Sequence, residues 1–154
     1  MTTSQTVAPV PNTVLAGETA LVTGAGQGIG RGIALALAPA GAQVAVVGRT
    51  ARTLESVADD ITRRGGVAQP YVCDVTDAEA VARLVPAVAE RFGGITVLVN
   101  NAQTPAPGPL LDLDEATYRE CMESGPTATW RMMRTCHPYL RGHGAVVNLG
   151  SAAG

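Results

Sequence analysis

Residues 23–30 have the spacing T-G-x-x-x-G-x-G, with Gly24, Gly28 and Gly30 as its glycines. The segment follows a short apolar run and opens a helical pattern, which is where a parallel α/β sheet binds phosphate. Gly24 permits a tight turn, Gly28 lets the backbone approach a pyrophosphate, and Gly30 lets the helix pack on the strand. The alternative is a flexible glycine-rich turn without a ligand. No G-K-[ST] follows, so a lysine-containing phosphate loop is excluded.

Ser151 is the second candidate for chemistry, because it directly follows the apolar run 144–150. A hydrolase nucleophile elbow needs G-x-S-x-G, but here Gly150 directly precedes the serine. His143 with Asp112 or Asp114 would complete a catalytic triad on paper only, since no spacing favours it. Ser151 is therefore expected to position a ligand or to serve as a turn residue.

Metal and disulfide chemistry are not expected. Cys73, Cys121 and Cys136 lie far apart and form no C-x-x-C pair, which favours three free thiols in a reducing compartment. His137 and His143 have no acidic residue at ligand spacing.

Composition indicates one globular domain. The chain has 154 residues, a formal charge of −2 and only 16% charged residues, so it has no basic surface typical of nucleic-acid binding. No apolar run is long enough to cross a membrane. Residues 1–16 lack the features of a signal peptide and are expected to form a disordered leader. We therefore expect a cytoplasmic protein with its domain at residues 17–154.

The elements that position these groups alternate between apolar runs and helical patterns. The expected strands are residues 19–24, 42–48, 67–75, 95–101 and 144–150, and the expected helices are 29–41, 51–66, 76–92 and 114–141. Continuous apolar strands separated by helices predict an α/β fold, a doubly wound parallel sheet of the Rossmann type.

Four local features refine this expectation. Ile29, Ile33 and Leu37 are expected on the inner face of the first helix, and Pro70 places its strand at a sheet edge. Thr76 and Glu79 have the spacing of a capping box. Gly125-Pro126 is expected to interrupt the last helix.

Four motifs in order resemble the short-chain dehydrogenase/reductase family, over residues 18–154: T-G-x-x-x-G-x-G, C-D-V at 73–75, N-N-A at 100–102 and the strand ending at Ser151. The resemblance implies that Ser151 is catalytic and that the other motifs bind a nicotinamide dinucleotide. The cofactor-binding residues so implied are Gly24, Gln27, Gly28, Ile29, Gly30, Asp74, Val75, Asn101 and Ala102.

The cofactor expected is NADP rather than NAD. An NAD site normally has an acid at the end of the second strand for the ribose 2′-hydroxyl. Gly48 occupies that position, and Arg49 follows it. A guanidinium suits a 2′-phosphate, unless Arg49 is simply a solvated loop residue.

The chain also departs from the family. The family's catalytic Tyr-x-x-x-Lys is missing, since the sequence contains no lysine. Gly125 stands where the family has a helix Asn, for which Ser124 is a candidate substitute. We therefore expect the N-terminal part of a longer NAD(P)-dependent oxidoreductase for a carbonyl or alcohol, with its sheet incomplete and this part inactive alone. The resemblance implies a homo-oligomer, a tetramer or dimer. The alternative is a non-catalytic dinucleotide-binding sensor or interaction module.

Overall fold

The computed structural model describes residues 14–105 and 108–150. Its five strands form one parallel sheet in the order β3-β2-β1-β4-β5. The strands are β1 (Thr19–Thr23), β2 (Gln43–Gly48), β3 (Val67–Val72), β4 (Ile95–Asn100) and β5 (Leu140–Asn148). The doubly wound parallel sheet is thus confirmed. The edge position of β3 confirms the expectation drawn from Pro70, whose missing amide hydrogen suits an edge strand.

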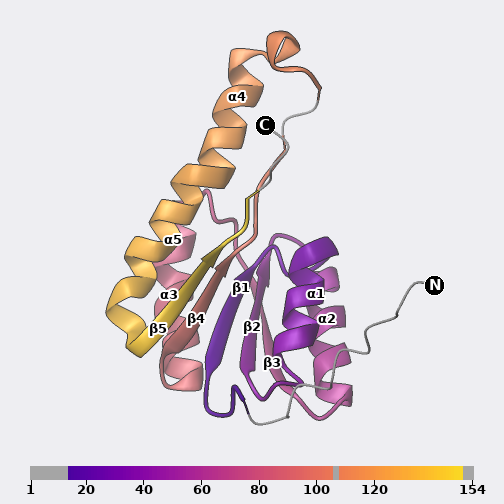
Figure 1. Cartoon of the computed structure of the whole chain (residues 1–154), viewed down its shortest axis with the longest axis vertical. Coiled ribbons are helices and arrows are strands. Elements are labelled where there is room, and N and C mark those ends of the chain that lie inside the picture. Colours follow the sequence, from indigo (N-terminus) through magenta and orange to yellow (C-terminus); the bar gives the residue numbers. More distant parts are fainter. Residues whose placement is uncertain (1–13, 106–107, 151–154) are drawn as a thin grey trace, which may run out of the picture.

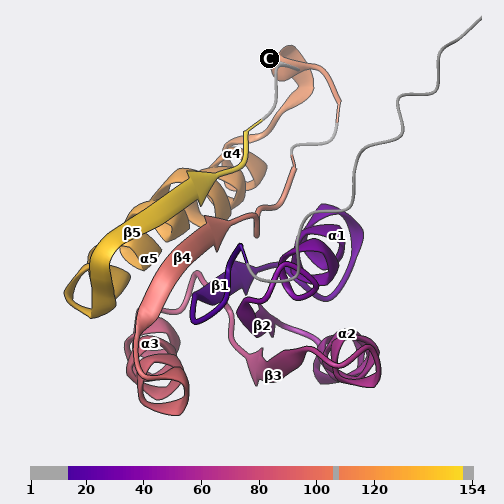
Figure 2. The ribbon, with the colours of Figure 1, turned by 60° about the horizontal axis from the view of Figure 1, so that its bottom comes forward.

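Helices cover both faces of the sheet (Figures 1 and 2). They are α1 (Gly28–Leu37), α2 (Ala51–Arg63), α3 (Ala78–Phe92), α4 (Glu115–Met122) and α5 (Ala128–Cys136). The helices α1 and α2 pack on one face, and α3 and α5 pack on the other. Figure 1 shows α4 extending beyond the ends of the strands.

Alternation along β1 divides the core between the two faces. Ala20 and Val22 belong to the cluster under α1 and α2, whereas Leu21 belongs to the cluster under α3 and α5. All three side chains are fully buried. Successive strand residues point to opposite faces, so a continuous apolar run supplies both layers at once.

The first helix differs from the expectation at Ile29. Ile33 and Leu37 pack against the core, but the Ile29 side chain is 69% exposed. Ile29 lies in the first turn of α1, above the edge of the sheet, where the buried residue facing β1 is Gly30. The inner stripe therefore begins at Gly30 and Ala34.

The predicted break at Gly125-Pro126 is confirmed. A single π-helical turn (Glu123–Thr127), called the π turn below, separates α4 from α5. Proline lacks the amide hydrogen that an α-helix requires and clashes with the preceding turn, which accounts for the wider turn here. A 3-10 turn (His137–Tyr139) ends α5. Consequently β5 begins at Leu140, four residues earlier than expected.

Helix α3 is capped by Asp77 rather than by Thr76, so the predicted capping box is wrong. The Asp77 carboxylate accepts hydrogen bonds from the amides of Glu79 and Ala80, at 2.9 and 3.0 Å. Thr76 instead donates its hydroxyl to Asp74. Thr76 lies between Asp74 and Asp77 in the sequence. Asp77 is nearer to α3, and its carboxylate therefore reaches the free amides of the first turn of the helix.

Replacing Asp77 with alanine is expected to lower the free energy of unfolding by about 1 kcal/mol, because two amides of the first turn lose their acceptor. Asp77→Asn, which keeps an acceptor oxygen, is expected to change it by much less. Chemical denaturation of the three proteins measures the difference. Equal losses in both variants would contradict the assignment of Asp77 as the cap.

The ordered domain includes part of the expected leader. The Leu15 amide donates to the Ala40 carbonyl at 2.8 Å, and the Leu15 side chain packs against the core. The rest of the expected leader, residues 1–13, lies outside the described residues.

Candidate functional site

A cleft of about 530 Å³ lies where β1, β2, β3 and β4 end at their carboxyl edge. Parallel α/β sheets bind ligands at this edge, next to the point where the strand order reverses. The reversal here falls between β1 and β4. The cleft is lined by nine of the predicted site residues: Gly24, Gln27, Gly28, Ile29, Arg49, Asp74, Val75, Asn101 and Ala102.

The glycine turn between β1 and α1 forms one wall of the cleft. Gly24 and Gly28 have φ angles of +63° and +52°, which residues with a side chain rarely adopt. A Cβ at Gly28 would meet nothing within 4 Å, so this part of the turn is open. Gln27 precedes α1 without capping it through its side chain, and the first turn carries no acidic residue. The N-terminus of α1 therefore presents uncapped amides and a positive dipole end, a favourable environment for an anion.

Gly30 has a different structural role from Gly24 and Gly28. It lies under the glycine turn and is not among the residues that line the cleft. A Cβ there would stand 2.3 Å from the Gly24 carbonyl oxygen and 2.4 Å from Asn101 Nδ2. Only glycine permits α1 to approach β1 this closely. Its role is to set the packing of the helix that carries the turn.

Asn101 and Thr23 join the ends of β1 and β4. Asn101 Nδ2 donates to the carbonyls of Thr23 and Gly24, at 3.0 and 3.3 Å. The buried Thr23 hydroxyl accepts from the amides of Asn101 and Ala102, each at 3.0 Å, and donates to the Val99 carbonyl. This network fixes the glycine turn against the loop after β4. Thr23 opens the glycine motif, but it is not among the site residues predicted above.

Replacing Thr23 with valine is expected to lower the free energy of unfolding by about 2 to 3 kcal/mol. Valine has the same shape but leaves two amides without an acceptor, and an unsatisfied buried group costs about 1 to 3 kcal/mol. Thr23→Ser retains the hydroxyl and is the matched control. Thermal and urea denaturation would measure both variants. A valine variant as stable as the serine variant would contradict a central role for this hydroxyl.

Asp74 sits in the turn after β3, opposite the glycine turn. Its carboxylate accepts from the Thr76 amide at 2.9 Å and from the Thr76 hydroxyl at 2.8 Å. The hydrogen bond from the Thr76 amide is the main cause that holds the pKa of Asp74 below its ordinary range. The hydrogen bond from the Thr76 hydroxyl and the charge of the nearby Arg49 lower this pKa further. Asp74 is therefore an anion and a hydrogen-bond acceptor at neutral pH. Thr76 was predicted only as a helix cap; the D-x-T spacing at residues 74–76 is the sequence signal that could have linked it to Asp74.

The neighbouring Cys73 thiol is not a nucleophile. It is only 4% exposed, and burial together with the charge of Asp74 raises its pKa to about 11. Nucleophilic cysteines need a lowered pKa. All three cysteines are free.

Ser124 occupies the π turn and lines the cleft. Its buried hydroxyl accepts from the Thr104 amide at 3.0 Å and donates to the Cys121 carbonyl at 3.4 Å. Ser124 thereby holds the loop after β4 against the π turn. Its predicted substitution for the family's helix Asn in a proton relay stays a prediction.

The catalytic role expected of Ser151 stays a prediction. Ser151 lies outside the described residues, and so does the side chain of His143. Asp114 caps α4 by accepting from the Thr117 amide at 2.7 Å. Among residues 14–105 and 108–150, no three His, Cys, Asp or Glu side chains group as metal ligands do. None of the helices described is both long and apolar enough to span a bilayer.

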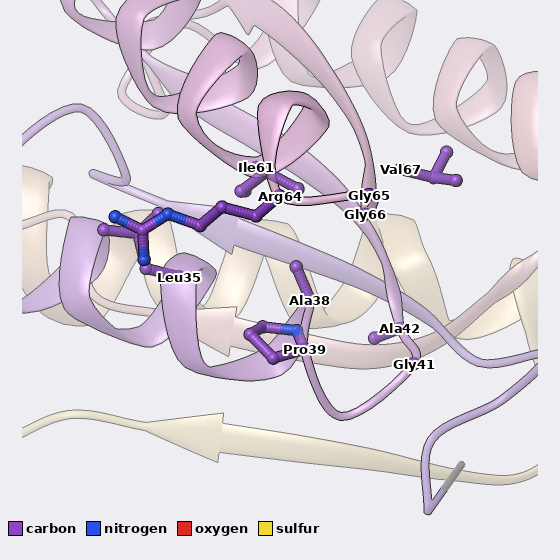
Figure 3. Close-up of a pocket in the computed structure, with 10 residues that line it drawn as sticks. All are labelled: Leu35, Ala38, Pro39, Gly41, Ala42, Ile61, Arg64, Gly65, Gly66 and Val67. Carbon is purple, nitrogen blue, oxygen red and sulfur yellow. The ribbon is translucent and has the colours of Figure 1, made fainter. Parts of the chain in front are cut away.

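A second, smaller hollow of about 200 Å³ lies between the ends of α1 and α2 (Figure 3). Arg64 is its one charged lining residue, and Figure 3 shows that side chain extending toward Leu35. Nearby amides are already used within the protein, since Gly41, Ala42 and Gly66 donate to carbonyls at the C-terminal ends of the preceding helices. This hollow lacks the convergent polar groups of the cleft.

Comparison with known proteins agrees with the fold and the position of the cleft. A family profile described as "short chain dehydrogenase" matches residues 18–154. The 12alpha-hydroxysteroid dehydrogenase of a Clostridium species is 37% identical, over 90% of this chain and 57% of that protein. The bovine (Bos taurus) hydroxysteroid dehydrogenase-like protein 2 is 36% identical, over 86% of this chain and 34% of that protein. The chain thus spans between one third and three fifths of the length of these relatives.

Solved structures give the same result. A short-chain dehydrogenase/reductase from Burkholderia xenovorans superposes with a TM-score of 0.86 at 38% identity, covering 90% of this chain and 58% of that one. A 7 alpha-hydroxysteroid dehydrogenase complexed with NADH and 7-oxo glycochenodeoxycholic acid has a TM-score of 0.85 at 31% identity, covering 94% and 57%. A metagenomic short-chain oxidoreductase in complex with NADP has a TM-score of 0.85 at 32% identity, covering 92% and 65%.

Proposed function

The chain belongs to the short-chain dehydrogenase family. We therefore propose that it is the cofactor-binding part of an oxidoreductase for a small carbonyl or alcohol substrate. One similar structure is complexed with NADH and another with NADP, which supports a nicotinamide dinucleotide as the ligand of the cleft. When bound, such a cofactor supplies hydride transfer, and the protein supplies binding, orientation and electrostatics.

The observation that carries this proposal is the uncapped N-terminus of α1 beside the open glycine turn. A pyrophosphate placed there would accept hydrogen bonds from the free amides of the first helical turn, and Gly28 leaves room for it. Each charge so placed gains about 0.3 to 1 kcal/mol from the helix dipole. The residues present therefore fit a dinucleotide.

The opposite wall fits the adenosine part of such a ligand. The ionised Asp74 would accept a hydrogen bond from the adenine amino group, while Val75 would lie against the ring. Asn101 and Ala102 would line the space between this wall and the pyrophosphate. Arg49 lines the cleft after β2 and has no carboxylate before it, which favours a ribose 2′-phosphate and hence NADP.

Proton transfer needs groups that these 154 residues do not contain. Ser151 would hydrogen-bond the substrate oxygen and orient it. The family's Tyr and Lys, which exchange and promote the proton, have no counterparts, since the sequence has no lysine. We therefore propose that this chain alone binds the cofactor without turning over substrate. A non-catalytic dinucleotide-binding module, which would use the same cleft without proton transfer, is the second candidate.

Binding selectivity tests the proposed cofactor. Replacing Arg49 with serine is expected to weaken NADPH binding about 10- to 100-fold, because a hydrogen bond to a charged group is worth about 1.5 to 3 kcal/mol. NADH binding should change less than about threefold. A fluorescence titration of both ligands measures this difference.

Arg52→Ser is the matched control, since this exposed arginine on α2 does not line the cleft. Equal affinities of the unaltered chain for NADPH and NADH would overturn the NADP preference. Failure to bind either ligand would overturn the dinucleotide site itself.

A further inference from the structure

We propose that Arg131, a residue of α5 outside the lining of the cleft, positions the turn that recognises adenine. Its Nη1 donates to the Val75 carbonyl at 3.0 Å, and its Nη2 donates to Glu123 Oε1 at 2.8 Å. Both partners line the cleft. The Arg131 side chain is only 17% exposed. This inference rests on the proposed function, because it concerns the adenosine wall of the same site.

The turn after β3 needs such support. β3 is an edge strand that ends at Val72, and among the described strands only β2 pairs with it. Beyond the strand, Cys73 donates to the Gly48 carbonyl, and Asp77 donates to Asp74 within the turn. The Arg131 bond adds a tie to the helical layer from a residue 56 positions away in the sequence. It acts on the peptide group that joins Val75 to Thr76, whose amide donates to the Asp74 carboxylate.

The guanidinium of Arg131 is a poor candidate for a phosphate ligand. Its fork already holds a backbone carbonyl and a carboxylate, and Glu123 balances its charge. A planar fork can hold both partners in fixed directions, which a lysine ammonium cannot do as well. Glu123 is itself placed by the π turn, next to Ser124, which holds the loop after β4. Arg131 therefore links the adenine turn to the same segment that fixes the opposite loop.

The preference of the site for adenine over hypoxanthine depends on the position of the turn that carries Asp74. The adenine amino group can donate to the Asp74 carboxylate, whereas hypoxanthine presents an oxygen at the same place and cannot. The ratio of affinities for NADPH and for its hypoxanthine counterpart therefore measures how well Asp74 is placed. A general loss of stability would lower the folded fraction for both ligands equally and leave the ratio unchanged.

The test is a titration of the full 154-residue chain with both dinucleotides. Arg131→Met is expected to reduce the preference for adenine at least about fivefold, and Arg131→Lys by less, since lysine restores one bond. Glu123→Gln is expected to reduce the preference for adenine as well. This variant keeps the Arg131 side chain, so it tests the inference even if Arg131→Met fails to fold. Arg134→Met is the control, because Arg134 lies on the same helix over the exposed Trp130 ring.

The outcomes separate the two claims. A preference for adenine that falls in the Arg131 and Glu123 variants but not in Arg134→Met supports the inference. Tight binding with an unchanged ratio in all of them overturns the inference alone. If the unaltered chain binds neither dinucleotide, the proposed function fails and the inference fails with it.

Discussion

Replacing Gly30 with alanine is expected to lower the free energy of unfolding by about 3 kcal/mol or more and to abolish dinucleotide binding. The new Cβ would stand 2.3 Å from the Gly24 carbonyl oxygen and 2.8 Å from its carbon. These are backbone atoms, so the clash cannot be relieved by a flexible side chain. Overpacking a close contact costs about 1 to 3 kcal/mol, occasionally more, and here it would also push α1 away from the turn it supports.

Gly32→Ala is the matched control for this variant. Gly32 is two residues further along α1, and a Cβ there would meet nothing within 4 Å. Alanine at an exposed helical position is expected to raise stability by about 0.5 to 1 kcal/mol. For a domain of this size, the Gly30 variant should therefore melt about 6 to 12 °C below the unaltered chain. Similar melting temperatures for the two variants would contradict the packing role of Gly30.

The unaltered 154-residue chain is expected to bind NADPH without oxidising it. General acid–base catalysis typically contributes about 10²- to 10⁴-fold, and the groups that would provide it are not among these residues. The measurement is NADPH absorbance with a panel of ketones, including a steroid ketone. A full-length family member assayed in parallel serves as the positive control.

Turnover by this chain would contradict that expectation, provided that Gly30→Ala abolishes it. Such a result would mean that other side chains of the chain supply the proton. Binding without turnover is compatible with both the cofactor-binding part of an enzyme and a non-catalytic module. Appending a segment with Tyr-x-x-x-Lys from a relative then separates them, since only the enzyme is expected to gain turnover.

The features that the sequence predicts well are those set by local pattern. The apolar runs around Leu21, Val46 and Leu98 identify buried parallel strands, because helices cover both faces of the sheet. The carboxyl ends of such strands meet at one edge, so the glycine turn, Asp74 and Asn101 could be expected to surround one cleft. The structure brings them together there.

The features that the sequence does not predict depend on three-dimensional neighbours. Helical periodicity places Ile29 on the inner face, but in the first turn of α1 the buried residue is Gly30, and Ile29 lines the cleft instead. Thr76 and Asp77 both suit a cap, and only the backbone path decides which one reaches the amides. The contact of Arg131 with Val75 joins two layers of the fold, and no local spacing signals it.

The most direct test of the dinucleotide site is a titration of the ¹⁵N-labelled chain with NADP, followed by amide chemical shifts. The expected result is saturable shifts at the glycine turn, Arg49, the Asp74–Thr76 turn and Asn101, with residues around Arg64 unchanged. Shifts confined to the small hollow near Arg64, or no saturable shifts at all, would contradict the assignment of the cleft as the cofactor site.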